Sequence, residues 1–280
     1  MNVVRTNAYA KLNLTLDVTG TENGYHMLDT LVTTVDLSDR VVVKKRKDGL
    51  CNITMHGGPF IPPEENNALR AAEAFVAAFG TNGADVTIYK NIPVGAGMGG
   101  SSADVAGVLR ALSELYAVQD EAALKELADG LGSDTGYLLT GGFARLTGRG
   151  ERVEGLTIGS KLHFLVLVPR GGVSTPQCFR EYDRINEGLS PRTQKAADEL
   201  ERGNVQECAR YFSNALYGAA CSLEPAVRDA LTDLKCFSPW GAGMTGSGSA
   251  CFALFENREL CEWAKSRYTG PCRAFVLQSV

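Results

Sequence analysis

Asn91-Ile-Pro-Val-Gly-Ala-Gly-Met-Gly-Gly-Ser-Ser-Ala-Asp104 is the stretch of this chain that says most about its fold. Its four glycines let the backbone turn sharply and approach a ligand with no Cβ in the way. Its two serines stand where a helix begins, and the first N–H groups of a helix favour a bound phosphate. The sequence therefore predicts a phosphate-binding loop. The residues concerned are Gly95, Gly97, Gly99, Gly100, Ser101 and Ser102.

Two common phosphate-binding loops fit this stretch less well. A Walker A loop ends in Gly-Lys-Ser or Gly-Lys-Thr, and no lysine follows Gly100. Gly95, Gly97 and Gly100 satisfy the dinucleotide pattern G-x-G-x-x-G, but no acidic residue follows a second strand at the expected distance. A simple strand-to-helix turn would need fewer glycines. The sequence therefore gives only weak support for an NAD-dependent oxidoreductase.

Strand and helix signals surround the loop in a mixed order. Apolar residues recur at helical spacing from Val105 to Tyr116, which predicts one amphipathic helix after the loop. The predicted strands are 13–18, 28–37, 41–45, 52–55, 85–89, 143–147, 162–168, 251–255 and 272–278. The further predicted helices are 67–79, 121–131, 193–201, 205–217, 225–234 and 259–267. This pattern predicts two α+β domains, residues 1–156 and 157–280.

Composition excludes several classes of protein. The chain has 280 residues, of which 44% are hydrophobic, so it is expected to form a large core. Its net charge of −4 argues against nucleic-acid binding. No apolar run suggests a signal peptide or a membrane span, and the eight cysteines form no C-x-x-C pair. We therefore expect a soluble cytoplasmic protein with reduced thiols and no membrane or nucleic-acid partner.

Three segments in order along the chain resemble the motifs of the GHMP kinases (galactokinase, homoserine kinase, mevalonate kinase and phosphomevalonate kinase). They are Ala8-Tyr-Ala-Lys-Leu-Asn13, Pro93-x-Gly-x-Gly-Met-Gly-Gly-Ser-Ser-Ala103 and Gly243-Met-Thr-Gly-Ser-Gly-Ser-Ala250. The resemblance implies an α+β fold with an N-terminal ribosomal-S5-domain-2-like domain and a C-terminal ferredoxin-like domain. It also implies an ATP-dependent enzyme that phosphorylates a small alcohol.

Further motifs are similar to one family within these kinases, the 4-diphosphocytidyl-2-C-methyl-D-erythritol kinases of isoprenoid precursor biosynthesis. Ala10-Lys-Leu-Asn-Leu-Thr-Leu-Asp-Val18 and Asn23-Gly-Tyr-His26 carry this similarity, with Asn23 where the family usually has aspartate. A clearer departure is Ser133-Asp-Thr-Gly-Tyr137, where the family commonly has Ala-Asp-Val-Pro-Phe. Because this departure adjoins a predicted catalytic residue, it bears on the identity of the acceptor.

The family resemblance assigns catalytic roles to Lys11 and Asp134. An acceptor hydroxyl must lose its proton, and a positioned carboxylate can take it. Asp134 is the predicted base, with capping of a short helix as its ordinary alternative. Lys11 is predicted to lie near Asp134 and keep it ionised, and its alternative is an exposed lysine at a strand end. Asn13 is predicted to share the face of Lys11 and bind substrate, because strand residues two apart point the same way.

The remaining predicted site residues would bind ATP and the cytidine-bearing substrate. Aromatic rings stack on a base with about 1–3 kcal/mol each. The resemblance implies that Tyr25 and Phe179 stack on cytosine and that His26 reads its edge. The predicted ATP-binding residues are Asn66, Pro93, Gly95, Gly97, Met98, Gly99, Gly100, Ser101, Ser102 and Ala103. The other predicted substrate-binding residues are Thr175, Gly246, Ser247 and Gly248.

Mg²⁺ is expected with ATP, because it neutralises phosphate charge, but the sequence does not identify its protein ligands. A monomer or a homodimer is equally compatible with the sequence. Two other functions stay open at this point. One is a GHMP kinase for homoserine, mevalonate or a similar alcohol, and the other is a nucleotide-binding homologue that has lost catalysis.

Overall fold

A computed structural model describes residues 2–185, 188 and 190–280 of the chain. The described residues form two compact units, and the strands β1 (Val3–Asn13) and β3 (Tyr25–Lys45) contribute to both. The first unit contains residues up to Ala10, Leu37–Pro93 and Gly99–Gly141, and the second contains Lys11–Asp36, Val94–Met98 and Gly142–Val280. The sequence division at residue 156 remains a prediction.

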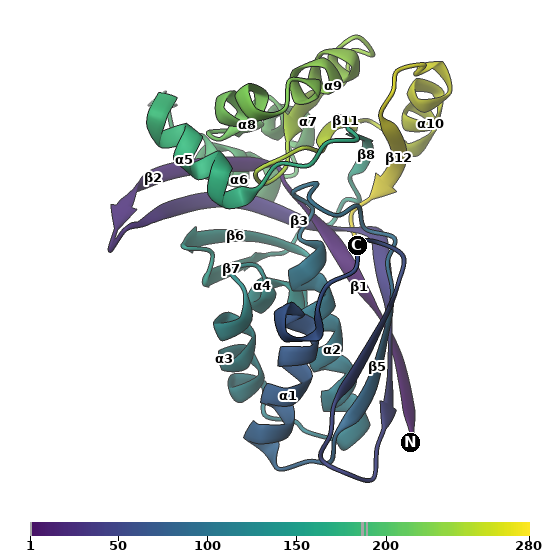
Figure 1. Cartoon of the computed structure of the whole chain (residues 1–280). Coiled ribbons are helices and arrows are strands. Elements are labelled where there is room, and N and C mark those ends of the chain that lie inside the picture. Colours follow the sequence, from purple (N-terminus) through teal and green to yellow (C-terminus); the bar gives the residue numbers. More distant parts are fainter. Residues whose placement is uncertain (1, 186–187, 189) are drawn as a thin grey trace. The chain divides into compact units, whose positions relative to one another are not determined.

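The first unit packs four helices against strands that include the C-terminal half of β3. This half is antiparallel to β5 (Ala84–Tyr89), and β4 (Asn52–His56) runs parallel to β5. The helices α1 to α4 gather on one side of these strands (Figure 1). They are α1 (Asn67–Phe79), α2 (Gly100–Tyr116), α3 (Glu121–Leu131) and α4 (Thr135–Thr140), and the short 3₁₀ helix η1 (Pro63–Glu65) precedes α1.

Helix α2 is the buried helix of this unit. Its apolar side chains from Val105 to Leu115 lie in the core, as its sequence periodicity predicts. At Gly107, a Cβ atom would lie 3.0 Å from Val41 and 3.1 Å from Ala8. The absence of a side chain at this glycine therefore lets α2 rest directly on the strands, which positions the start of the helix.

The second unit contains a four-stranded antiparallel sheet in the order β10-β11-β8-β12. Its central pair places Phe252 opposite Val166, and both residues are fully buried. The strands of this sheet are β8 (His163–Val168), β10 (Gly241–Met244), β11 (Cys251–Phe255) and β12 (Arg273–Gln278). Its helices are α5 (Thr175–Ile185), α6 (Thr193–Glu201), α7 (Val205–Ala209), α8 (Tyr217–Leu223), α9 (Ala226–Lys235) and α10 (Arg258–Arg267).

The same unit includes strands that join the N-terminal half of β3, either directly or through one neighbouring strand. They are β2 (Thr15–Glu22), β6 (Phe143–Gly148), β7 (Arg152–Leu156), which pairs with β6, and β9 (Ser213–Asn214), which pairs with β2. Asn23 and Gly24 join β2 to β3 with φ values of 51° and 78°. Such left-handed pairs make the tight turn of a β-hairpin, and this turn sets His26 opposite Thr21.

Most predicted elements are present, and the exceptions have physical causes. The predicted strands 28–37 and 41–45 are one continuous strand, β3. The list of predicted elements lacks the strands β1, β7 and β10 and the helices α4 and α5. The predicted helix 205–217 is wrong, because β9 and irregular backbone separate α7 from α8. There the Asn214 side chain donates to the carbonyls of Met244 and Gly246, and these tertiary bonds hold the segment in a non-helical shape.

Candidate functional site

The first half of the glycine-rich loop packs against the C-terminal glycine motif within the second unit. A Cβ atom at Gly97 would lie 2.2 Å from the carbonyl oxygen of Thr245, and φ at Gly97 is +75°. The backbone N–H of Ala250 donates to the carbonyl of Ala96 at 3.1 Å, and that of Val173 donates to Gly95 at 3.3 Å. Glycine is therefore required at position 97 both by conformation and by close approach.

The second half of the loop opens helix α2 in the first unit. Gly99 occupies the N-cap position with φ of 73°, and the helix runs for 17 residues from Gly100. Ser101 is exposed and Ser102 is half-buried, while Ala103 is buried and donates its N–H to the Gly99 carbonyl at 2.8 Å. The first N–H groups of a long helix have no intrahelical acceptor, so this end suits a phosphate.

A buried cluster of charges lies under this helix start. The Lys90 ammonium donates to Asp104 at 2.6 Å and also to Asp39, and all three side chains are at most 7% exposed. A Cβ atom at Gly100 would lie 3.6 Å from Lys90 Nζ. The pKa of Asp104 is raised to about 7, chiefly because the carboxyl is buried, while Lys90 lowers it and the neighbouring Asp39 raises it. The second oxygen of Asp104 is buried without a partner among the described residues.

Asp39 also fixes the entry to the loop, because its carboxylate accepts the backbone N–H groups of Asn91 and Ile92. From the sequence, Asp104 was quoted only as the last residue of the glycine-rich stretch, and Lys90 and Asp39 were not singled out. A lysine directly after a buried strand was the available signal. An aspartate in the middle of a strand, 51 residues before it, gave no local indication of this contact.

Lys11 and Asn13 lie together at the end of β1, as predicted. The Lys11 ammonium donates to Asn13 Oδ1 at 2.5 Å, and both side chains are buried. The Asn13 backbone N–H donates to Thr245 Oγ1 at 2.9 Å, and the Thr245 hydroxyl is 3.2 Å from the carbonyl of Gly97. Thr245 thereby joins the N-terminal motif, the glycine-rich loop and the C-terminal motif in one network.

The remaining members of the C-terminal motif form a loop of left-handed glycines. Gly246 and Gly248 have φ values of 57° and 87°. The Ser247 hydroxyl lies 2.8 Å from that of Thr175, so these two predicted substrate-binding residues are in contact. Met98, predicted for ATP, has a buried side chain, and its carbonyl accepts the N–H of Lys11 at 3.0 Å. The visible contact of Met98 is therefore a backbone hydrogen bond that ties the loop to β1.

Asp134 immediately precedes helix α4, at the N-cap position. Its side chain makes no capping hydrogen bond to that helix, so the ordinary structural alternative for this residue does not apply. The departure from the family pattern that follows it is in the core. Thr135 is fully buried, and Tyr137 is among the largest fully buried side chains. These substitutions therefore change internal packing of the first unit.

Two of the residues predicted for cytosine, His26 and Phe179, meet where the β2–β3 hairpin lies against α5. The His26 ring stacks on Phe179 with centroids 4.7 Å apart, and His26 Nε2 lies 2.7 Å from an oxygen of Asp183. Tyr25 is 53% exposed, and the Arg149 guanidinium lies 3.9 Å from the centre of its ring. One face of Tyr25 is thus covered by a cation.

Two predicted ATP-binding residues outside the glycines have other visible contacts. Asn66 caps α1, because its Oδ1 accepts the N–H of Ala68 at 3.0 Å, and its amide nitrogen contacts Met55 Sδ. Asn66 is buried, so the structure gives it a clear architectural role. Pro93 is half-buried at the start of the loop.

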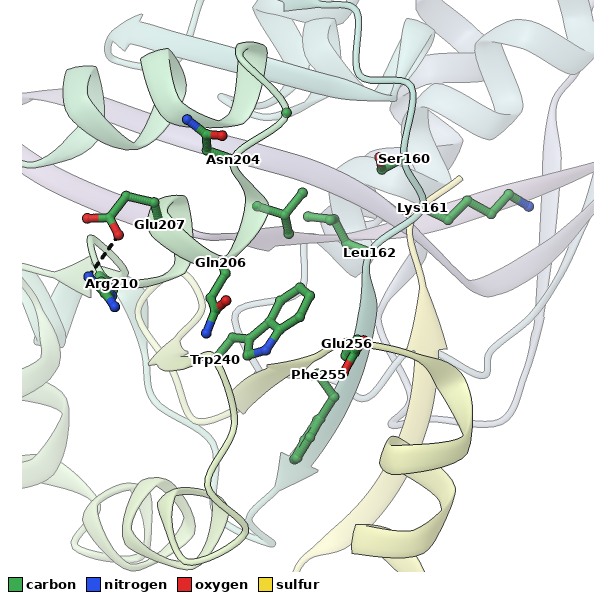
Figure 2. A pocket seen from close by; sticks show the side chains of 12 residues that line it. Ser160, Lys161, Leu162, Asn204, Gln206, Glu207, Arg210, Trp240, Phe255 and Glu256 are labelled. Carbon is green, nitrogen blue, oxygen red and sulfur yellow. Dashed lines mark ion pairs between the residues drawn. The ribbon is translucent and has the colours of Figure 1, made fainter.

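A separate pocket of about 530 Å³ lies in the second unit (Figure 2). Trp240, Phe255 and Leu162 supply its apolar lining, and an ion pair between Glu207 and Arg210 lies at its edge. None of the predicted site residues lines it. Within residues 2–185, 188 and 190–280, no three metal-binding side chains cluster, and no helix is long and apolar enough to cross a membrane.

Comparison with known proteins gives consistent matches. The models of the GHMP kinases N terminal domain and the GHMP kinases C terminal domain match residues 66–143 and 196–265. A 4-diphosphocytidyl-2-C-methyl-D-erythritol kinase of Pelotomaculum thermopropionicum is 36% identical over 272 residues, which cover 95% of this chain and 94% of that protein.

Solved structures also match this chain. A crystal structure of 4-(cytidine 5'-diphospho)-2C-methyl-D-erythritol kinase matches with a TM-score of 0.84 and 32% identity, covering 99% of this chain and 100% of that one. A homoserine kinase from Cytophaga hutchinsonii matches with a TM-score of 0.74, covering 100% and 95%, but at 17% identity it supports the fold alone.

Proposed function

The chain belongs to the family of 4-diphosphocytidyl-2-C-methyl-D-erythritol kinases within the GHMP kinases, and we propose how its residues perform the phosphoryl transfer. The predicted two-domain GHMP kinase fold is confirmed. The enzyme transfers a phosphoryl group from ATP to the 2-hydroxyl of 4-diphosphocytidyl-2-C-methyl-D-erythritol, a step in isoprenoid precursor biosynthesis. The acceptor therefore carries a cytidine diphosphate group.

One observation carries the assignment of roles to residues. Thr245 bonds both to Asn13 and to the carbonyl of Gly97, so three motifs far apart in the sequence converge. Phosphoryl transfer depends mainly on alignment and on stabilising charge, which requires such convergence. We assign the phosphates of ATP to the loop that ends at the start of α2. Mg²⁺ bound with ATP would neutralise charge on the β- and γ-phosphates.

We propose that few protein ligands hold the metal ion. Mg²⁺ retains several waters and takes phosphate oxygens together with one or two carboxylates. Among the described residues, no three candidate metal ligands cluster. The carboxylate of Asp104 is already engaged by Lys90, so we assign it to the support of the loop.

Asp134 is the proposed general base. It accepts the proton of the 2-hydroxyl as that oxygen bonds to the γ-phosphorus and the bond to ADP breaks. Its place directly before α4 matches the position of the base in the kinase family that the sequence resembles. Lys11 is proposed to keep the base ionised and to orient the hydroxyl, and its hydrogen bond to Asn13 supports its placement.

The substrate site is proposed to extend from the C-terminal motif to the hairpin. Ser247 and Thr175 present adjacent hydroxyl groups, and Gly246 and Gly248 allow close approach to the substrate phosphates. Tyr25 and Phe179 are proposed to stack on cytosine beside His26. We propose a cytoplasmic enzyme, monomeric or homodimeric, with domains at 1–156 and 157–280.

Release of ADP from Mg-ATP tests this function. Turnover is expected with the cytidyl acceptor and not with homoserine or mevalonate, and turnover confined to another alcohol would contradict the cytosine site. Asp134→Asn should lower kcat by about 10²- to 10⁴-fold while ATP affinity changes little. Asp120→Asn is the matched control, because Asp120 caps α3 and asparagine caps equally well. Full turnover by Asp134→Asn would refute the base.

A further inference from the structure

Three side chains on one face of α5 hold the His26 ring. Phe179, Tyr182 and Asp183 are spaced by three and four residues, so they project from the same side of the helix. Phe179 stacks on the imidazole at 4.7 Å with an interplanar angle of 21°, and Tyr182 meets it edge-on at 5.9 Å. Helix α5 lies beside the β2–β3 hairpin (Figure 1). The ring is therefore fixed in both plane and rotation.

The contact with Asp183 determines which imidazole nitrogen carries the proton. An ionised carboxylate only accepts hydrogen bonds, so a nitrogen 2.7 Å from Asp183 Oδ1 must be a donor. In a neutral histidine the proton is then on Nε2, and Nδ1 is left as an acceptor. Within the described part of the chain, His26 Nδ1 has no hydrogen-bond partner, so it is available to a ligand.

We propose that Asp183 is a positioning residue that fixes the Nε2–H tautomer of His26 and so makes the site select an amino-pyrimidine. Cytosine presents a donor, its exocyclic N4 amine, at the position where uracil presents an acceptor, its O4 carbonyl. Nδ1, as an acceptor, can receive a hydrogen bond from the cytosine amine. With uracil it would face a second acceptor, the O4 carbonyl, and no hydrogen bond could form. This inference rests on the proposed cytosine site at Tyr25 and His26.

The neighbouring carboxylate on the same helix cannot take this role. Glu181 is engaged by Arg184 at 2.7 Å and by the hydroxyl of Ser222 at 2.6 Å. Its charge is thereby compensated on a different face of α5 from the one that meets His26. This residue gives a matched control, because Glu181→Gln removes one carboxylate from α5 without touching the imidazole.

The first test measures the tautomer directly and does not depend on activity. Long-range ¹H–¹⁵N correlation spectra at about pH 8, above the ordinary histidine pKa, distinguish the two neutral tautomers. The chain has three histidines, so His56→Gln and His163→Gln assign the signals. We expect the Nε2–H form in the native protein and in Glu181→Gln, and a mixture in Asp183→Asn. An Nδ1–H form in the native protein would overturn the proposal.

The second test measures selectivity between the cytidyl acceptor and its uridyl counterpart. Asp183→Asn should lower the ratio of kcat/KM for the two acceptors by about three- to tenfold, chiefly through a higher KM for the cytidyl compound. Glu181→Gln should leave the ratio unchanged. An unchanged ratio in Asp183→Asn would overturn the proposed role. Absence of turnover with both acceptors in the native protein, alongside the expected tautomer, would instead refute the proposed function.

Discussion

The buried cluster at Lys90 and the pair at His26 both hold a basic side chain with carboxylates, but in opposite surroundings. Lys90 and its two partners are at most 7% exposed, whereas Asp183 is 59% exposed beside a His26 that is 16% exposed. Water screens charges at the second site and hardly at the first. The Lys90 cluster should therefore contribute to the stability of the fold beneath the glycine-rich loop. The His26–Asp183 pair should instead determine the tautomer of one imidazole ring.

The largest effect on stability is expected from removing the lysine of the buried cluster. Lys90→Met leaves Asp39 and Asp104 buried together without their cation, which costs about 3–5 kcal/mol of unfolding free energy. Urea denaturation measures this loss. Lys125→Met is the control, because Lys125 forms an exposed pair with Asp129 that contributes at most about 0.5 kcal/mol. Equal losses of unfolding free energy in Lys90→Met and Lys125→Met would show that burial does not make the Lys90 cluster more important than an exposed ion pair.

A smaller effect is expected from the protonation of Asp104. The pKa of this carboxyl is raised in the folded protein to about 7, whereas it is near 4 in the unfolded chain. Between these two pKa values the folded state holds a proton on Asp104 that the unfolded chain has lost. The contribution of this proton to the free energy of unfolding therefore falls as pH rises and is lost above about pH 7. Asp104→Asn should remove about 2 kcal/mol of the difference in stability between about pH 5 and about pH 8.

Denaturation of both proteins at the two pH values tests this expectation. Asp120→Asn again serves as the control, because it changes one carboxylate at a cap without altering the cluster. A pH dependence that is the same in native protein and Asp104→Asn would show that Asp104 is ionised throughout this range. In that case the attraction of Lys90 would outweigh the effect of burial on the pKa of Asp104.

The loop and its helix could be predicted from sequence because their signals are local. Glycine spacing marks the turn, and the apolar periodicity after Val105 marks α2. The cluster beneath them could not be predicted, since Asp39 and Lys90 are distant in sequence and a single charged residue carries no pairing information. The same reason hid Asp183, which contacts His26 from 157 residues away. Long-range polar contacts therefore account for most of what sequence reasoning missed in the site.

The false helix at 205–217 illustrates the same limit in the fold. Its apolar pattern is compatible with a helix, but Asn214 bonds to the backbone of the C-terminal motif and to the N–H of Leu216. Three tertiary or turn-forming bonds from one side chain outweigh helix propensity, which is small for each residue. An asparagine in an otherwise helical pattern was the only local signal of this interruption.

The smallest effect on stability is expected where the effect on chemistry is most specific. Asp183→Asn removes an exposed carboxylate, so the free energy of unfolding should change by less than about 1 kcal/mol. The stacking of His26 on Phe179 should persist, because it does not depend on that charge. Urea denaturation of this variant beside Lys90→Met completes the comparison. A loss as large as that of the buried cluster would mean that the His26–Asp183 contact holds α5 on the hairpin, and the exposed site would then be architectural as well.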